Sequence, residues 1–489
     1  MITVPQPSFL ALDWWALGPV MALTLGAIVL LLMEFMPQRA NGNRGGIVSL
    51  LTLLASGYAV YRVAGEKREL FGGMLVHDSL SVFFTMLFCA IGVLSVLISW
   101  DYVKRTKINQ AEYYALLLSS VLGMVVMAAS NDLITIFLGL ELMSLALYIM
   151  VGFRRSQLES NEAALKYFLL GAFASGFLLY GIALLYGATG TSNLALMGAF
   201  LADTPLLQSP LLLLGAVLVF VGFAFKVAAA PFHMWTPDVY EGAPTSVTGF
   251  MSAGAKAAGF AALLRVGLRA LGPVQADWTH LIAVIAFLTM TVGNLTALLQ
   301  GNLKRMLAYS SIAHAGYILV AVAAGGSEAA SAAVFYLATY SFMNIGAFAV
   351  LTMMGKGREE RVLMSDLSGL GFRQPALGLA LTVFMLSLAG IPPLAGFMGK
   401  LYIFGEAVKH PQLLWLVVAG VLNSVVSVYY YLRVTVALYM KEPEGEVVGI
   451  SWGVPAVLAI VLTLAATLYF GLQAQSLWVQ AQNSVLGLL

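Results

Sequence analysis

The stretch LVFVGFAFKVAAAPFHMW, residues 218–235, places one lysine inside an otherwise apolar run. Apolar or small residues flank Lys226 on both sides, and Pro231 follows it by five positions. Proline removes a helix donor and frees a carbonyl group, which membrane proteins tolerate only where the backbone lines a cavity or packs on protein. The stretch therefore predicts a broken membrane helix that carries a buried charge.

The rest of the chain is equally apolar. Of its 489 residues, 60% are hydrophobic and only 10% are charged, against about 25% in soluble domains. No single soluble core could hide that much apolar surface. The runs are also continuous, whereas the strands of membrane barrels alternate polar and apolar residues. We therefore predict an all-α polytopic membrane protein.

Apolar runs between polar breaks predict about fourteen transmembrane helices, at ~20 residues for each crossing. The predicted spans cover residues 14–36, 46–63, 79–100, 112–130, 132–151, 163–187, 207–230, 245–271, 278–300, 303–324, 329–354, 375–408, 412–440 and 451–475.

A second break lies at Pro392 and Pro393, which precede Lys400. One lysine comes before its proline and the other comes after, as expected for two units of opposite topology. The pattern predicts two inverted five-helix repeats, each with a discontinuous helix. The predicted units are the first three helices, the first repeat, the second repeat and a C-terminal helix, at residues 1–111, 112–271, 272–440 and 441–489.

Loop charges predict the orientation, because Lys and Arg collect in cytoplasmic loops. Loops after odd-numbered spans hold fourteen basic residues: Arg39, Arg44, Lys104, Arg105, Lys107, Arg154, Arg155, Lys304, Arg305, Lys356, Arg358, Arg361, Arg373 and Lys441. Loops after even-numbered spans hold six: Arg62, Lys67, Arg68, Arg265, Arg269 and Lys409. The bias puts the odd-to-even loops in the cytoplasm and both termini on the outer, periplasmic side.

The remaining basic residues lie inside or at the edge of predicted spans: Lys166, Lys226, Lys256, Lys400 and Arg433. A lysine near a helix centre costs roughly 2.5–3.5 kcal/mol on insertion scales. Glu141 lies in a similar apolar run, LITIFLGLELMSLALYIM. Charges that are this costly to bury indicate a function inside the membrane.

Buried lysines suit proton transfer. Desolvation lowers the pKa of a buried lysine, and a neighbouring carboxylate raises it. At an effective dielectric constant near 20, a carboxylate about 4 Å away contributes about 4 kcal/mol, which changes a pKa by about three. We predict that Glu141, Lys226, Lys256 and Lys400 form a proton relay. The alternatives are structural ion pairs, lysines that snorkel to an interface and, for Glu141, an anchor that bonds two helices.

Three further residues are weaker relay candidates. His233 follows Pro231 and could pass protons, or could make a capping or loop hydrogen bond. His314 lies in the middle of a span, at a position that would mirror Glu141 in the second repeat, and is either a relay or a packed polar residue. Lys166 lies four residues after Glu162, a spacing that also fits an ion pair at a helix end.

Other classes of chemistry are excluded by composition. The single cysteine, Cys89, permits no disulfide framework, cysteine cluster or zinc site. The five histidines are scattered, and neither G-x-G-x-x-G nor G-x-x-x-x-G-K occurs. A net charge of +2 provides no field for nucleic acid. We therefore predict no metal and no cofactor in this chain.

Four segments resemble a known family: LGLELMSLALY (138–148), PFHMWTPDVYEGAP (231–244), NLKRMLAYSSIAHAGY (302–317) and GIPPLAGFMGK (390–400). They are similar to the antiporter-like membrane subunits of respiratory complex I, the proton-translocating NADH:quinone oxidoreductase. The likeness covers essentially the whole chain. The residues of these segments and the length of the chain resemble the N-type branch, the counterpart of mitochondrial subunit 2. Ser246, where a second proline is commoner, departs from the pattern at a position without a titrating group.

The resemblance implies roles for the buried charges. Glu141 and Lys226 match the Glu–Lys pair of the fifth and seventh spans, and Lys256 matches the lysine of the eighth. Lys400 matches the lysine of the twelfth span, where M-type subunits have glutamate. Lys166 matches a lysine in the sixth span of N-type chains.

The resemblance also implies partners and a place in the cell. The chain would lie in the bacterial inner (plasma) membrane beside M-type and K-type subunits, coupled to a peripheral arm that carries the flavin and the iron–sulfur clusters. It would be a non-redox subunit of the translocase that moves protons. Two other functions stay open from the residues alone: a subunit of a secondary cation/proton antiporter, and a scaffold whose charges fix helix register.

Overall fold

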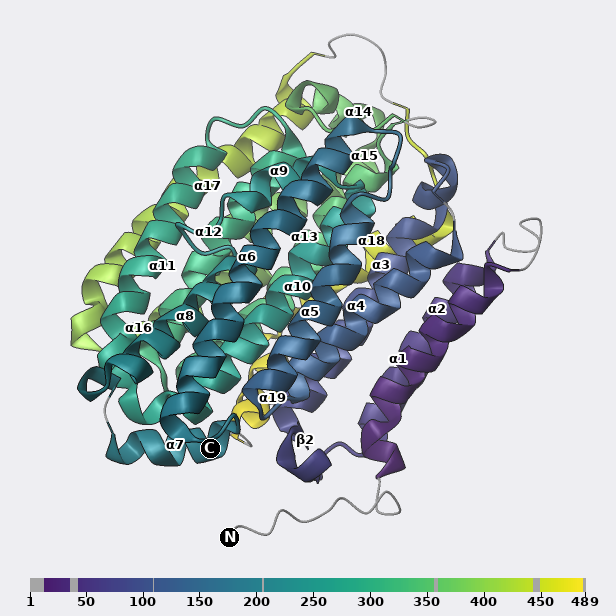
Figure 1. Cartoon of the computed structure of the whole chain (residues 1–489). Helices are drawn as coiled ribbons and strands as arrows, with labels where there is room; N and C mark the ends of the chain where they lie inside the picture. Colours follow the sequence, from purple (N-terminus) through teal and green to yellow (C-terminus); the bar gives the residue numbers. More distant parts are fainter. Residues whose placement is uncertain are drawn as a thin grey trace.

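The computed structural model describes residues 13–35, 43–108, 110–204, 206–355, 359–442 and 449–486. The long helices are α1 (Trp14–Met33), α2 (Arg44–Arg62), α3 (Ser79–Arg105), α4 (Ala111–Ala129), α5 (Leu133–Val151), α6 (Leu158–Thr189), α8 (Pro210–Val227), α10 (Thr245–Arg265), α11 (Gln275–Ala297), α12 (Leu303–Ala324), α13 (Gly326–Met353), α17 (Leu414–Met440) and α18 (Val454–Leu472). They lie side by side in one bundle (Figure 1).

Shorter elements connect the long helices or lie at the ends of the bundle. The shorter α-helices are α7 (Leu194–Asp203), α9 (Trp235–Gly242), α14 (Leu370–Arg373), α15 (Pro375–Ala389), α16 (Ala395–Ala407) and α19 (Ala474–Leu486). The 3₁₀ helices are η3 (Phe71–Gly73), η4 (Leu206–Gln208), η6 (Gly272–Val274), η7 (Met364–Leu367) and η8 (Pro411–Leu413), and η5 (Val266–Ala270) is a π-helical turn that continues α10. Strands β1 (Arg68–Leu70) and β2 (Leu75–His77) pair as an antiparallel hairpin in which Glu69 faces Val76.

Most of the predicted spans are confirmed. In the described part of the chain, 12 helices are long and apolar enough to cross a membrane. The less apolar α2 and the pair α15 and α16, which together fill the predicted span 375–408, complete the fourteen. The innermost helices are α10, whose residues are all buried, and α12 and α13, which are nearly so.

Both predicted helix breaks are present, and they have the same local form. α8 ends before Ala228, which has a left-handed backbone with φ of 61°, and α15 ends before Gly390, with φ of 90°. A proline follows three residues later in each case, Pro231 and Pro393, and the peptide bond before each is cis. Because neither proline can donate a backbone hydrogen bond, the helix resumes only at α9 and α16.

The inverted repeat is visible in paired backbone hydrogen bonds. In each repeat, two backbone hydrogen bonds join the start of the second helix to the segment after the third helix. The bonded residues of the second repeat lie 170 positions after those of the first, for example 303 after 133 and 362 after 192. The donor and acceptor pairs are Leu133 with Ser192 and Leu194 with Asn131, then Leu303 with Val362 and Met364 with Gly301, all at 2.7–3.0 Å. The two sets lie at opposite ends of the bundle, as inverted topology requires.

Glycines repeat the same correspondence. A β-carbon on Gly123 of α4 would lie 2.5 Å from the backbone nitrogen of Met143 in α5. One on Gly293 of α11, again 170 positions further on (123 to 293), would lie 2.6 Å from the nitrogen of Ala313 in α12. The first two helices of each repeat therefore pack backbone to backbone, which only small residues allow.

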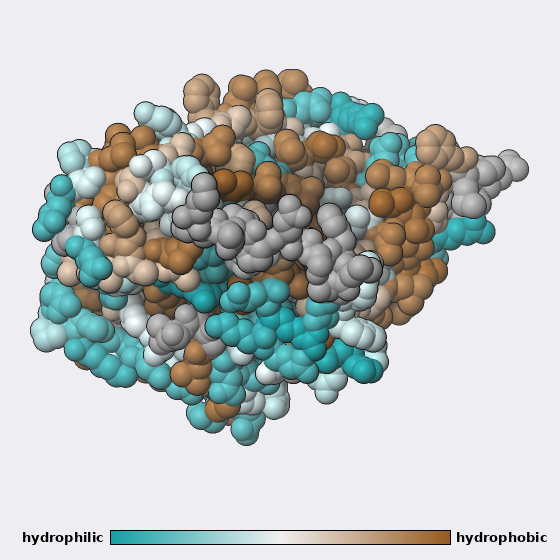
Figure 2. Space-filling model, turned by 60° about the horizontal axis from the view of Figure 1, so that its bottom comes forward, coloured by the Kyte–Doolittle hydropathy of each residue, from teal (hydrophilic) through white to brown (hydrophobic). Residues whose placement is uncertain are grey.

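The loop charges divide the two ends of the bundle as predicted. We call the end with α9 and α14, where Arg154 and Arg305 line a pocket with residues of α9, the basic end. The end with the hairpin, α7, α19 and the start of α1 is the terminal end (Figure 1). Figure 2 brings the terminal end forward and shows hydrophilic residues gathered there, with hydrophobic residues along the flank. Three basic residues used for the orientation, Arg39, Lys356 and Arg358, lie outside the described residues.

The sequence did not predict the elements at the terminal end. The hairpin and α7 are too short to show a membrane-spanning pattern, and α19 has 13 residues, fewer than the ~20 that a crossing needs. α19 buries Ala474, Leu477 and Ala481 against the bundle. Apolar residues at such spacing bury one face of a short helix and leave the other exposed.

Candidate functional site

Lys226 lies in the last turn of α8, directly before the first helix break. Its side chain is buried, and Nζ donates hydrogen bonds to the hydroxyl of Ser144 on α5 at 2.8 Å and to that of Tyr167 on α6 at 3.4 Å. Nζ also lies 5.7 Å above the ring of Tyr167, which stacks on Trp235 of α9. Three helices around the break therefore hold one ammonium group.

Glu141 lies on α5 three residues before Ser144 and accepts a hydrogen bond from Ser175 of α6. Among the ion pairs of the described residues, Glu141 and Lys226 are not joined. A cavity of about 10 Å³ beside Lys226 is lined by Ser144 and by Ser175, the residue that donates to Glu141. That is about the volume a single water molecule requires.

Lys256 lies on the fully buried helix α10. Nζ donates a 2.5 Å hydrogen bond to the backbone carbonyl of Ser311 on α12. The stem of Lys226 packs on Gly259, because a β-carbon there would lie 3.4 Å from Cγ of that lysine. Gly259 lies three residues after Lys256 on α10, so the stem of Lys226 packs about one helical turn from Lys256.

His314 lies on α12 three residues after Ser311, and both of its ring nitrogens are engaged. Nδ1 lies 2.6 Å from the hydroxyl of Tyr336 on α13, and Nε2 lies 2.9 Å from the hydroxyl of Tyr431 on α17. A neutral imidazole donates through one nitrogen and accepts through the other. The ring therefore links two hydroxyl groups that belong to different helices.

Lys400 lies on α16 just after the second break, and its side chain is buried. Nζ donates to the carbonyls of Leu388 and Ala389 at 3.3 and 2.8 Å and to the hydroxyl of Ser424 at 2.9 Å. The two carbonyls end α15, where the helix dipole places partial negative charge. Nζ also lies 5.0 Å above the ring of Tyr317, one turn from His314. The half-helix end therefore stabilises the ammonium.

The internal repeat changes which residue of the first repeat corresponds to His314. With the 170-residue correspondence, His314 mirrors Ser144, and Glu141 mirrors Ser311. The prediction that His314 mirrors Glu141 was wrong by three residues, close to one helical turn.

Lys166 and His233 lie away from the buried residues Lys226, Lys256, His314 and Lys400. Lys166 is half exposed at the basic end and pairs with Glu162 and Asp238 at 2.7 and 2.8 Å, while Asp238 also binds Arg305 of α12. His233 lies in the break after α8, and its Nδ1 atom is buried without a hydrogen-bond partner among the described residues. The structure therefore brings together Glu141, Lys226, Lys256, His314 and Lys400, and leaves Lys166 and His233 outside.

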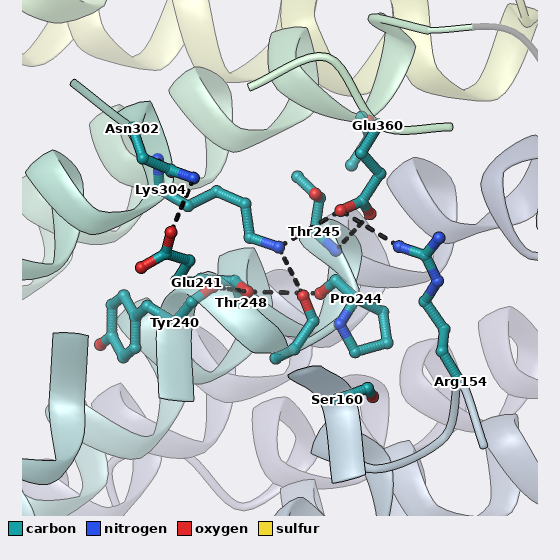
Figure 3. Close-up of polar contacts among 12 residues, drawn as sticks. Arg154, Ser160, Tyr240, Glu241, Pro244, Thr245, Thr248, Asn302, Lys304 and Glu360 are labelled. Atoms are coloured by element: carbon teal, nitrogen blue, oxygen red, sulfur yellow. Dashed lines mark hydrogen bonds and ion pairs between the residues drawn. The ribbon is translucent and has the colours of Figure 1, made fainter. Parts of the chain in front are cut away.

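The sequence missed a buried carboxylate at the basic end, Glu360 (Figure 3). Its side chain is 11% exposed and lies 3.3 Å from Nζ of Lys304 and 3.2 Å from the guanidinium of Arg154. It also accepts hydrogen bonds from the hydroxyl of Tyr102 and, at 3.1 Å, from the backbone N–H of Thr245, which starts α10. The charged run GKGREER suggested a solvated loop, and no local pattern distinguishes Glu360 from Glu359.

The charged neighbours of Glu360 determine the pKa of its carboxyl group. Burial by itself would raise the pKa of the carboxyl, but the charges of Lys304 and Arg154 and the donated hydrogen bonds outweigh it and lower the pKa to about 2. Lys304 also donates a 2.6 Å hydrogen bond to the carbonyl of Ala243, between α9 and α10. Glu360 therefore ties the second repeat to the start of the helix that carries Lys256.

A polar vestibule of about 790 Å³ opens beside this cluster at the basic end. Its lining includes Lys166, Asp238, Glu241, Arg305 and Glu360. Arg305 donates to Asp238 and Glu241 at 2.7 and 2.8 Å, which holds α9 against α12. Water reaching the vestibule comes close to the first helix break.

Comparison with known proteins shows which chains this one resembles. A family model described as the membrane domain of NADH:quinone oxidoreductase and Mrp antiporters matches residues 130–427. The chain is 50% identical to NADH-quinone oxidoreductase subunit N of Trichlorobacter lovleyi, and the match covers 94% of each chain.

Two solved structures share the fold over nearly the whole length. A chain of respiratory complex I from Thermus thermophilus, solved with bound aureothin, is 37% identical with a TM-score of 0.80, covering 94% of this chain and 98% of that one. A chain of the Mrp complex from Dietzia sp. DQ12-45-1b has a TM-score of 0.84 at 21% identity, covering 98% of each chain.

Proposed function

The chain belongs to the NADH:quinone oxidoreductase/Mrp antiporter membrane family, in its subunit N branch, and from this premise we propose how it moves protons. It is a proton-translocating, antiporter-like membrane subunit of NADH-quinone oxidoreductase. The observation that carries the proposal is the line of buried titratable side chains Lys226, Lys256, His314 and Lys400 through the middle of the bundle, with the half-buried Glu141 beside its first member.

In the proposed relay, each lysine alternates between a charged and a neutral form. The stem of Lys226 packs on Gly259 of α10, three residues after Lys256, and Ser311, which binds Lys256, lies one turn before His314. The imidazole lies beside the ring of Tyr317 on the same helix α12, and Nζ of Lys400 on α16 lies 5.0 Å from that ring. A charge change at one station alters the cost of charge at the next, because Coulomb coupling is strong away from water.

Glu141 sets the direction of the first step. When its carboxylate is charged, it favours the charged form of Lys226, one turn of α5 away from the Ser144 hydroxyl that binds the lysine. When a proton or a movement of α5 weakens that field, the ammonium is left in apolar surroundings and releases its proton towards Lys256. The carboxylate therefore acts as a positioning charge for the lysine.

We propose that protons enter at the basic end through the vestibule, where Lys166 and Asp238 lie at the water boundary. With the positive-inside bias, this end faces the cytoplasm of a bacterial cell, and both termini lie on the periplasmic side. His233, in the helix break, is the candidate carrier between the vestibule and Lys226.

The chain supplies no redox centre in this proposal. It has a single cysteine and no nucleotide-binding motif, so the flavin and the iron–sulfur clusters belong to the peripheral arm of the complex. M-type and K-type subunits are the proposed neighbours in the membrane. Their movements would reach the relay through the exposed apolar faces of the bundle.

The test uses the assembled complex in inverted membrane vesicles, with NADH oxidation and proton uptake measured together. Lys226→Ala should lower both rates by roughly tenfold or more, since a positioned proton carrier is commonly worth about 10²–10⁴ in rate. Lys409→Ala is the matched control, because Lys409 is exposed and pairs only with Glu406. Wild-type pumping by an assembled Lys226→Ala complex would contradict the proposed relay.

A secondary cation/proton antiporter subunit is the second candidate function. The likeness to the Mrp chain is at 21% identity and supports a shared fold alone, whereas the relative at 50% identity is a subunit N. Copurification with redox subunits separates the two, because an antiporter subunit would be isolated without them.

A further inference from the structure

The ammonium group of Lys400 has no carboxylate beside it. Among the described residues, its Nζ contacts two carbonyl oxygens, one hydroxyl group and one aromatic ring, and it forms no ion pair. Further along α16, Glu406 pairs with Lys409. Lys226, in contrast, has Glu141 on the same helix as its hydroxyl ligand. A buried ammonium without a counter-charge is costly, so neutral groups have to stabilise Lys400.

Tyr317 of α12 presents its ring to Lys400. Nζ lies 5.0 Å from the ring centroid, within the ~6 Å over which an aromatic face attracts a cation. Among the described residues, no hydrogen bond joins Nζ to the hydroxyl of Tyr317. Lys226, in contrast, donates to the hydroxyl of its own tyrosine, Tyr167, at 3.4 Å. The two lysines therefore use their tyrosines differently, and Lys400 uses the ring.

The hydroxyl of Tyr317 is bonded on the side away from the lysine. It accepts a hydrogen bond from Nδ2 of the buried Asn294 on α11 at 3.1 Å. The same amide nitrogen donates to Oδ1 of Asn423 on α17 at 3.1 Å, and Oδ1 of Asn294 accepts from the hydroxyl of Tyr430 at 2.9 Å. A buried amide whose nitrogen and oxygen are both bonded in this way is held in one orientation. Asn294 therefore fixes the hydroxyl end of Tyr317.

Close packing holds the ring of Tyr317 in place. A β-carbon on the adjacent Gly316 would lie 2.5 Å from Cγ of Met290, so α12 and α11 touch at this level. On the other side, the ring meets Phe404 of α16 edge-on, with 6.0 Å between the centroids and 89° between the planes. Phe404 lies four residues after Lys400 and thus on the same face of α16. The tyrosine is wedged between α11 and the face of α16 that carries the lysine.

We propose that Tyr317 is a further residue of the relay, whose ring face stabilises the charged form of Lys400, and that Asn294 is the positioning residue that holds the ring there. The inference rests on the proposed proton relay and adds the group that takes the place of a carboxylate at its last lysine. An aromatic face attracts a cation less strongly than a buried carboxylate does. The ring therefore lets Lys400 carry a proton and still release it.

The helices packed against α16 are α12, α13, α15, α17 and α18, and they place no other charged side chain at Lys400 in the described part of the chain. α15 has no titratable residue, and α18 has only Tyr469, which is exposed. Besides Tyr317, the titratable side chains at this level are one imidazole and four phenols: His314, Tyr336, Tyr340, Tyr430 and Tyr431.

The test changes the charge on the ring face of residue 317 in the assembled complex. Phenylalanine and phenylalanines with increasing numbers of fluorine atoms replace Tyr317, because fluorine withdraws electrons from the ring face and changes its shape little. Tyr317→Phe is the reference, and proton uptake is measured as a function of pH. The alkaline limb of the pumping profile should move to lower pH as fluorines are added, by about one pH unit over the series. Lowering the pH should restore pumping, which it would not do for a packing defect.

Phe84 of α3 is the matched control position. Its ring is buried, and among the described residues no cation lies over it, so the same fluorinated rings there should leave the profile unchanged. A profile that does not move with fluorination at position 317 would overturn the inference. If Lys400→Ala is inactive in that case, only the role of Tyr317 fails. If Lys400→Ala pumps at the wild-type rate, the relay itself is wrong.

The role of Asn294 is tested by a double-mutant cycle. Asn294→Ala releases the hydroxyl end of Tyr317, so it should move the alkaline limb in the same direction as fluorination does. In that background, fluorinated rings at position 317 should have a smaller effect than in the native background, because residues that act together are not additive. Equal effects of fluorination in the two backgrounds would contradict the positioning role of Asn294.

Discussion

The ammonium of Lys226 is hydrogen-bonded to the hydroxyl of Ser144 at 2.8 Å. The expected carboxylate, Glu141, lies one turn away on the same helix and is bonded to Ser175 instead. The lysine is thus held in place by neutral groups, and the carboxylate makes no direct hydrogen bond to it among the described contacts. Removing the charge and removing the anchor should therefore have different effects.

Glu141→Gln should slow pumping while leaving the complex assembled. The amide can still accept the hydrogen bond of Ser175, but it no longer stabilises the charged form of Lys226. We expect a loss of roughly tenfold or more in coupled NADH oxidation, with the wild-type amount of complex on native gels. Glu442→Gln, an exposed carboxylate near the end of α17, is the control. If Glu141→Gln pumps like this control, the carboxylate has no role in the relay.

Glu360→Gln should destabilise the complex more than it slows the relay. It removes the carboxylate that pairs with the buried cations Lys304 and Arg154, and breaking a buried pair typically costs about 3–5 kcal/mol. Thermal melting of the purified complex measures the change. Glu359→Gln should be nearly neutral, because Glu359 is 72% exposed and pairs with Arg361 at the surface. Equal melting temperatures for the two variants would contradict a stabilising role for Glu360.

The same carboxylate gives a pH dependence with a definite sign. The folded-state pKa of Glu360, about 2, lies below its ordinary value of 4.5. The stabilisation is therefore present above about pH 4.5 and is lost as pH falls towards 2, with a total of roughly 3 kcal/mol. The melting temperatures of wild type and Glu360→Gln should converge over that window. A constant difference between pH 7 and pH 3 would contradict the pKa assignment.

Gly123→Ala should weaken the contact between α4 and α5. The new β-carbon would lie 2.5–2.6 Å from backbone atoms of Met143 and Gly139, so the helices must separate, at a cost of about 1–3 kcal/mol. The yield of assembled complex reports the effect. Gly176→Ala on α6 meets nothing within 4 Å and should be neutral or slightly stabilising. A normal yield for Gly123→Ala would show that this close approach is not needed.

The sequence predicted much of the fold and less of the site. Continuous apolar runs located the spans, and the prolines located both breaks, because these signals are local. The contact of Lys226 with Ser144 and the ring of tyrosines around His314 depend on how distant helices pack, which no local pattern encodes. Glu360 was missed for the same reason, since its partners come from α12, the loop after α5 and the start of α10.

The chain expressed and purified alone should carry no chromophore. It contains a single cysteine and no nucleotide-binding motif, so we expect no visible absorbance and no binding of NADH. The assembled complex, in which other subunits are proposed to carry the flavin and the clusters, is the positive control. A stoichiometric flavin, haem or cluster on the isolated chain would overturn this prediction.

The most direct test of the relay is proton pumping by Lys400→Arg in the assembled complex. Arginine keeps the positive charge that the carbonyls of Leu388 and Ala389 stabilise, but a guanidinium does not release a proton in proteins. The account predicts normal assembly with turnover as low as in Lys400→Ala. Pumping by Lys400→Arg at the wild-type rate would show that Lys400 is a fixed charge and not a proton carrier.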